Sequence, residues 1–87
     1  MQEETLLEFP CDFPVKIMGA ARDDFVETML ALVLEHAPDF DSTNMQMRPS
    51  AKGNYLALTC TIRATSKVQL DGLYRALTVH PYVKMAL

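Results

Sequence analysis

The most informative stretch of the chain is residues 43–64, which read TNMQMRPSAKGNYLALTCTIRA. Apolar and polar side chains alternate in both halves, as in two strands that each have one buried face. Matching Met47 with Leu58 sets the two apolar faces opposite each other, because paired positions in an antiparallel hairpin keep a constant index sum. The same register leaves Lys52-Gly53 as a two-residue turn, in which Gly supplies the positive φ.

Four further elements flank this hairpin. Residues 13–18 alternate like a strand with one buried face. Residues 23–37 carry apolar side chains at helical spacing and acidic side chains in the first turns, which predicts a helix. Ser66-Lys67-Val68-Gln69 matches a capping box and opens a second helix. Gly72 lies within that helix at a cost of about 1 kcal/mol relative to Ala, which indicates a close neighbour. Residues 82–87 alternate again and predict a last strand.

The order strand, helix, strand, strand, helix, strand predicts an α+β fold, the ferredoxin-like βαββαβ sandwich. Right-handed crossovers place both helices on one face of a four-stranded antiparallel sheet and leave the other face open. We expect this single domain over residues 13–87, after a lead segment, residues 1–12, whose Leu6, Leu7 and Phe9 dock on the core. The predicted core consists of Val15, Ile17, Val26, Met29, Leu30, Val33, Met45, Met47, Leu56, Leu58, Cys60, Ile62, Leu70, Leu73, Leu77, Val83 and Met85.

Length and charge exclude several classes of protein. The chain has 87 residues, enough for one domain. Its net charge of −3 and its pI near 5.2 predict no general attraction to nucleic acid or to an anionic membrane. The start, Met1-Gln2-Glu3-Glu4, lacks the basic and apolar pattern of a secretory signal. The longest apolar run, Met29–Leu34, is far shorter than the roughly 20 residues of a membrane-spanning helix. We therefore expect a cytoplasmic location.

The open sheet face is the first candidate for a functional surface. Strand alternation places on it Lys16, Met18, Gln46, Arg48, Tyr55, Ala57, Thr59, Thr61, Arg63, Lys84 and Ala86. This set is basic, contains no acid, and is flat because Ala and Thr are small. Such a face either stays solvated or binds protein, through self-association or a separate partner. We predict a non-enzymatic regulatory or protein-binding module. Its expected anchors are Arg48 and Arg63, surrounded by Tyr55, Lys16 and Lys84.

Charge is unevenly divided along the chain. Residues 1–44 carry ten acids and two bases, whereas residues 45–87 carry one acid and six bases. One interpretation is compensation between the two helices, with acids of the first helix facing Lys67 or Arg75 of the second. The other is a dipolar molecule with a basic docking surface.

Several stretches carry a family resemblance, and together they span nearly the full chain. They are Leu7-Glu8-Phe9-Pro10-Cys11-Asp12-Phe13-Pro14, Lys16-Ile17-Met18-Gly19, His36-Ala37-Pro38, Gly53-Asn54-Tyr55, Ala64-Thr65-Ser66, Gln69-Leu70-Asp71-Gly72-Leu73-Tyr74-Arg75 and His80-Pro81-Tyr82-Val83-Lys84-Met85. In these stretches the chain resembles the YbeD-like family of small bacterial cytosolic proteins of uncharacterised function. The resemblance implies a fold similar to ACT domains, which are regulatory modules that bind amino acids.

The ACT-like resemblance implies an alternative function, the sensing of an amino acid or related metabolite. Sites of that kind use the turn after the first strand, usually together with a partner subunit. Here this turn contains Gly19, Asp23 and Asp24. The two carboxylates disfavour a ligand carboxylate at that helix end but suit an ammonium group. Genes of the family often lie beside lipoate-attachment genes, which indicates a context and no chemistry.

The sequence contains little evidence for other types of functional site. The RNA-recognition signature needs interleaved aromatics, and residues 52–59 contain only Tyr55. His36 and His80 each stand near a Pro at a predicted helix end, as capping residues do. No His or Cys pair has metal-ligand spacing, and we expect no cofactor. Cys60 has the pattern of a buried small hydrophobe.

Overall fold

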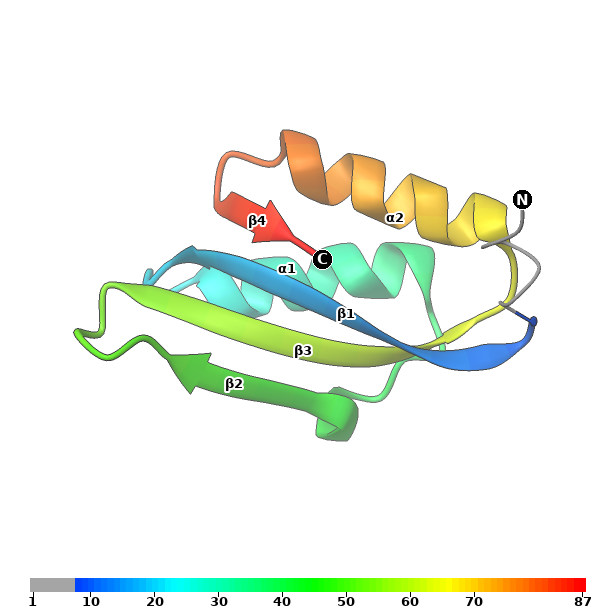
Figure 1. The fold of residues 1–87 in the computed structure, drawn as a ribbon, viewed down its shortest axis with the longest axis horizontal. Helices are drawn as coiled ribbons and strands as arrows, with labels where there is room; N and C mark the ends of the chain where they lie inside the picture. The colour runs from blue at the N-terminus through cyan, green and yellow to red at the C-terminus, as the bar shows by residue number, and fades with distance from the viewer. Residues whose placement is uncertain (1–7) are drawn as a thin grey trace.

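The computed structural model describes residues 8–87 of the chain (Figure 1). Its elements are β1 (Cys11–Ala20), α1 (Phe25–His36), the 3₁₀ turn η2 (Ser42–Asn44), β2 (Met45–Pro49), β3 (Tyr55–Ala64), α2 (Lys67–Val79) and β4 (Val83–Ala86). The strands form one antiparallel sheet in the order β2-β3-β1-β4. This arrangement confirms the predicted ferredoxin-like α+β fold. The predicted docking of Leu6 and Leu7 lies outside the described residues, whereas Phe9 packs against the core as expected.

The hairpin register agrees with the prediction, but the turn does not. Met47 pairs with Leu58 as expected. The chain reverses over residues 51–54, so the expected two-residue turn is wrong. Ser50 closes this longer loop, because its N–H donates to the Tyr55 carbonyl at 2.9 Å and its hydroxyl accepts from the Tyr55 N–H at 3.1 Å. Gly53 adopts the positive φ, 74°, that the loop requires.

β1 starts at Cys11, two residues earlier than the predicted strand, and runs through Pro14. Pro lacks an N–H and is rare in central strands. In this sheet the Lys16 N–H points toward the C-terminal strand and donates to the Leu87 carbonyl at 3.0 Å. The nitrogen of Pro14, two residues earlier, faces the same side beyond the end of that pairing. No donor is required there, which explains how the strand tolerates this Pro.

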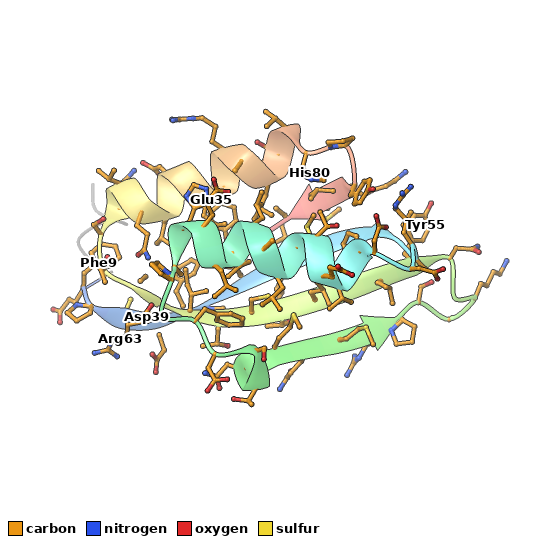
Figure 2. The ribbon with its side chains drawn as sticks, turned by 180° about the vertical axis from the view of Figure 1, so that it is seen from behind. Phe9, Glu35, Asp39, Tyr55, Arg63 and His80 are labelled. Carbon is orange, nitrogen blue, oxygen red and sulfur yellow. The ribbon has the colours of Figure 1, made fainter. Side chains whose placement is uncertain are left out.

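The core lies between the sheet and the two helices (Figure 2). Ten predicted core residues are buried: Val15, Ile17, Met29, Val33, Leu58, Cys60, Ile62, Leu70, Leu73 and Leu77. Five others are half-buried and pack against them: Val26, Leu30, Met45, Leu56 and Val83. The prediction missed Phe25, Ala37, Phe40 and Ala64, which are also buried. Phe25 matters most for the site, because its ring packs over Gly19, where a Cβ would overlap it.

Two predicted core residues, Met47 and Met85, are wrong. Met47 is 57% exposed because β2 is an edge strand, and both helices lie toward the other edge of the sheet (Figures 1 and 2). Met85 is 49% exposed because the pairing of β1 with β4 slips by one residue, from Gly19 opposite Val83 to Met18 opposite Met85. This β-bulge reverses the alternation after Lys84. Ala86, predicted on the open face, therefore packs against the core instead.

The start of α2 also holds the end of α1. The Ser66 hydroxyl accepts from the Gln69 N–H at 3.1 Å, as the capping box predicts. The Gln69 side chain accepts from the Thr65 N–H at 2.7 Å and donates to the His36 carbonyl at 2.9 Å. The neighbour of Gly72 is the His36 ring, but a Cβ there would lie 3.5 Å from it, an ordinary contact, so this approach does not require a glycine.

Candidate functional site

The open sheet face carries a continuous group of exposed apolar side chains. Arg48, Ala57, Met18 and Met85 follow one another across β2, β3, β1 and β4. In the next row across the sheet, the Lys16 N–H donates to the Leu87 carbonyl at 3.0 Å, and the Leu87 N–H donates to the Lys16 carbonyl at 2.8 Å. We call Met18, Tyr55, Ala57, Met85 and Leu87 the apolar patch. Met18 is 38% and Leu87 67% exposed, although large apolar side chains usually avoid solvent when they lie together.

The bulge in β4 places two of the five residues of this patch, Met85 and Leu87, on the open face. It turns the consecutive residues Lys84 and Met85 toward the open side of the sheet. Met85 lines a hollow together with Met18, Ala57 and Leu87. The Lys84 ammonium lies 5.6 Å from the centroid of the Tyr55 ring, within cation–π range. Lys84 and Tyr55 therefore lie together, as expected for residues of one surface. Met85 and Leu87 also lie on this surface, where strand alternation had not placed them.

The centre of the open face is hollowed. Three shallow hollows share Ala57 as part of their lining. Ala57 and Thr59 on β3 are small, whereas longer side chains rise from β1 on one side and from β2 on the other. We call this depression the trough. The expected flat face is thus concave, because the small residues are confined to its middle strand.

Positive charge on this face is concentrated near one end. Lys16, Arg48 and Lys84 are exposed and form no salt bridge within residues 8–87. At the other end Arg63 lies 3.4 Å from Asp12. The prediction of a face without acids is wrong, since the early start of β1 brings Asp12 onto it. Figure 2 shows Tyr55 and Arg63 at opposite ends of β3.

The predicted compensation between helices is not seen in the described part of the chain. The ion pairs there join Arg22 to Asp24, Arg63 to Asp12, and Lys67 to Asp71, the last within α2. Each of these pairs is exposed and contributes little to stability. The three unpaired cations of the open face therefore remain available to a partner.

The turn after β1, predicted as a ligand site, is occupied by the protein's own side chains. Arg22 lies over the Tyr82 ring, with its guanidinium carbon 4.0 Å from the centroid. The Tyr82 hydroxyl accepts from Arg22 at 2.9 Å and donates to Asp24 at 3.0 Å, and Arg22 also donates to Asp24 at 3.0 Å. The hydrogen bond from Arg22, followed by that from Tyr82, lowers the pKa of Asp24.

Gly19 and Asp23 complete the description of this turn. Gly19 is buried under the Phe25 ring and the Tyr82 carbonyl, while Asp23 is exposed. A ligand ammonium would therefore compete with Arg22 for Asp24. Amino-acid binding at this turn stays a prediction. The involvement of Tyr82 had no local signal, because it lies 58 residues after Asp24.

The two histidines lie at helix ends, and Cys60 lies in the core. His36 ends α1, and His80 caps the end of α2, where its Nδ1 accepts from the Tyr82 N–H at 3.1 Å. Burial raises the pKa of the Cys60 thiol to about 11. Within residues 8–87, no three His, Cys, Asp or Glu side chains group as metal ligands would. None of the helices described is both long and apolar enough to cross a membrane.

Comparison with known proteins supplies the family. Residues 4–87 match the model of a family described as "Protein of unknown function (DUF493)". The chain belongs to the DUF493 family. A UPF0250 protein of Nitrosomonas europaea is 55% identical over 87 residues, which cover all of both chains. A UPF0250 protein of Ralstonia nicotianae is 57% identical over 84 residues, 97% of this chain and 87% of its own.

Other relatives extend the DUF493 match to further bacteria. A UPF0250 protein of Bordetella pertussis is 53% identical over 85 residues, which cover 98% of this chain and 93% of the relative. These similarities confirm the resemblance to the YbeD-like family. None of these family descriptions names an activity, so the function is inferred from the surface of the protein.

Proposed function

We propose that this protein is a non-enzymatic regulatory module that binds a protein partner through its open sheet face. The observation that carries the proposal is the apolar patch and, around it, three cations that form no salt bridge within residues 8–87: Lys16, Arg48 and Lys84. An apolar centre with a charged rim is the usual composition of a protein interface. The apolar area supplies affinity, and the rim charges favour partners of opposite sign.

The patch is built from side chains suited to recognition. Met is unbranched and polarisable, so Met18 and Met85 can adapt their shape to a partner. Tyr55 offers an aromatic surface whose hydroxyl remains available, and aromatic residues are enriched at interfaces. The sheet that carries them is held on its other face by the core, so the patch is presented on a rigid support.

The two predicted anchors have different surroundings. Arg48 lies beside Ala57, at the edge of the apolar patch, and is free of salt bridges within residues 8–87. Arg63 lies at the far end of β3 and is paired with Asp12. A cation that already has a carboxylate gains less from a partner. We therefore expect Arg48, with Lys16 and Lys84, to contribute more to binding than Arg63.

The test uses matched charge reversals on the two sides of the molecule. Arg48→Glu changes the open face, and Arg75→Glu makes the same change on the exposed surface of α2. Proteins retained from a cell lysate by the immobilised wild-type chain are identified, produced in pure form and titrated against each variant. We expect Arg48→Glu to weaken binding at least tenfold and Arg75→Glu to change it less than twofold.

Both variants should melt within a few degrees of the wild type, because exposed substitutions usually change stability by less than about 0.5 kcal/mol. A purified partner that binds both variants equally well would show that the interface lies elsewhere. A partner lost with Arg75→Glu and kept with Arg48→Glu would assign binding to the helical side.

A further inference from the structure

We infer that the partner contributes an amphipathic α-helix with acidic flanks, which lies along β3 in the trough of the open face. This inference rests on the proposed function and specifies the chemistry of the occupant. Two features carry it. One is the shape of the trough, and the other is the distribution of apolar and cationic groups along its two walls.

A helix laid along β3 would reach both walls of the trough. Its floor is formed by Ala57 and Thr59 on β3, and its walls rise from β1 and β2, the two neighbours of β3. The backbones of β1 and β2 are two strand spacings apart, roughly 10 Å, and the wall side chains occupy part of that distance. An α-helix with its side chains is roughly 10–12 Å across. An extended segment would leave much of this width unfilled, and its backbone would find no sheet edge to bond there.

The β1 and β4 wall carries apolar groups together with two cations, Lys16 and Lys84, whereas the β2 wall carries Arg48. On the β1 and β4 side, Met18, Met85 and Leu87 present exposed apolar groups. On the β2 side, Arg48 presents a guanidinium that can hold a carboxylate with two hydrogen bonds. A helix with an apolar stripe and carboxylates beside it satisfies both walls at once, since side chains three and four positions apart share one face.

The ends of the basic region set the expected length. Tyr55 and Lys84 lie at one end, and the Arg63–Asp12 pair lies beyond Thr61 at the other. The rows that carry Lys84, Arg48 and Lys16 run from Tyr55 to Thr59 on β3, over which the strand rises roughly 14 Å. A helix covers that distance in roughly 9 residues, or two to three turns. The occupant is therefore expected to be a single short helix.

A second copy of this chain fits the face poorly as a symmetric partner. Face-to-face contact about a two-fold axis would bring Lys16, Arg48 and Lys84 of each copy against the same basic surface. Like charges set against each other cost binding energy. The observed surface favours a separate, acidic partner instead.

The test places a photo-crosslinker at the rim of the trough. Gln46→p-benzoylphenylalanine puts the probe on β2 beside the floor, where Gln46 is exposed. Val68→p-benzoylphenylalanine is the control, because Val68 is 80% exposed on α2. After irradiation in cells, adducts formed from position 46 and not from position 68 are digested and sequenced. The crosslinked segment is then synthesised as a labelled peptide for titration.

We expect the segment to carry apolar residues at i, i+3, i+4 and i+7 with carboxylates beside them. The peptide should gain helical circular dichroism on binding. Arg48→Glu should raise its Kd at least tenfold, and Arg75→Glu should leave it within twofold. Raising the salt concentration from 50 to 300 mM should also weaken it, because the contacts to the rim are ionic.

The outcomes separate the two proposals. A site-specific adduct whose segment is basic, extended or devoid of an apolar stripe would overturn the acidic helix and leave the proposed function standing. An adduct with a second copy of this chain would replace the separate partner with self-association. The absence of any adduct specific to position 46 would overturn the proposed function itself.

Discussion

The two faces of the sheet use alternate residues of the same strands and differ in almost every physical property. On the covered face, Val15, Ile17 and Leu58 have no more than 1% exposure and pack under the helices. On the open face, the neighbouring Met18 and Tyr55 each keep 38% exposure. The covered face carries the stability of the fold, while the open face can change with little effect on it. Stability and recognition should therefore respond to different mutations.

The largest effect is expected at Gly19, where the covered face meets the turn after β1. A Cβ there would overlap the Tyr82 carbonyl and the Phe25 ring. The carbonyl belongs to the backbone and cannot rotate away, so Gly19→Ala should destabilise the protein by about 3 kcal/mol, at the upper end for overpacking. Urea unfolding followed by circular dichroism measures the loss.

Gly53→Ala is the matched control for Gly19→Ala. Gly53 has a positive φ of 74° but nothing within 4 Å of the position of a Cβ. Its replacement should cost only the backbone conformational term, about 1 kcal/mol. Equal losses at the two glycines would show that the packing of Phe25 and Tyr82 adjusts to the added methyl group.

Much of this covered face could be predicted from sequence, because its signals are local and periodic. The pairing of Met47 with Leu58 followed from alternation in two adjacent stretches. The missed Phe25 differs, because it stands at the start of α1, one position before the residues that show the helical period. Its burial depends on the space left by Gly19, which no spacing rule reveals.

The open face was harder to predict, because one inserted residue in β4 exchanges the faces to which the following side chains point. The sequence from Val83 to Leu87 alternates equally well in either phase, so the bulge at Lys84 leaves no periodic signal. The Arg63–Asp12 pair was missed because Asp12 was assigned to the lead segment, whereas β1 starts at Cys11. The contact of Tyr82 with Arg22 and Asp24 joins distant segments, and it depends on the completed sheet.

A smaller effect on the covered face is expected at alkaline pH. Burial raises the pKa of Cys60 to about 11 from 9.0, and burial raises the pKa of Tyr74 as well. For groups whose pKa is raised by folding, the stabilisation is complete below the unfolded pKa and is lost as the pH rises through the folded value. The free energy of unfolding should therefore fall between about pH 9 and 11, by roughly 1–2 kcal/mol after allowance for solvent screening.

Urea unfolding at several pH values measures this slope, and Cys60→Ala is the informative variant. It lowers stability at every pH by removing a buried side chain, but it should flatten the fall between pH 9 and 11. Tyr74→Phe should flatten it less, because Tyr74 is only half-buried and its hydroxyl also donates to the Leu87 carbonyl. An unchanged slope in the Cys60 variant would mean that the thiol is hydrated in the folded protein.

The smallest effect on stability is expected on the open face itself, at Met85. Met85→Gln keeps the length of the side chain and replaces an exposed thioether with an amide. Because 49% of Met85 is exposed, the amide can be solvated, and the free energy of unfolding should change by less than about 0.5 kcal/mol.

The same substitution at Met47, 57% exposed on the edge strand β2, serves as the control for stability. Binding should separate the two positions, since Met85 belongs to the apolar patch, whereas Met47 borders the trough but pairs with Leu58, so its side chain shares the covered face. We therefore expect Met85→Gln to weaken partner binding severalfold and Met47→Gln to leave it unchanged. A loss of stability above about 1.5 kcal/mol at Met85 would show that this side chain is packed as core, which would remove the central apolar group from the proposed interface.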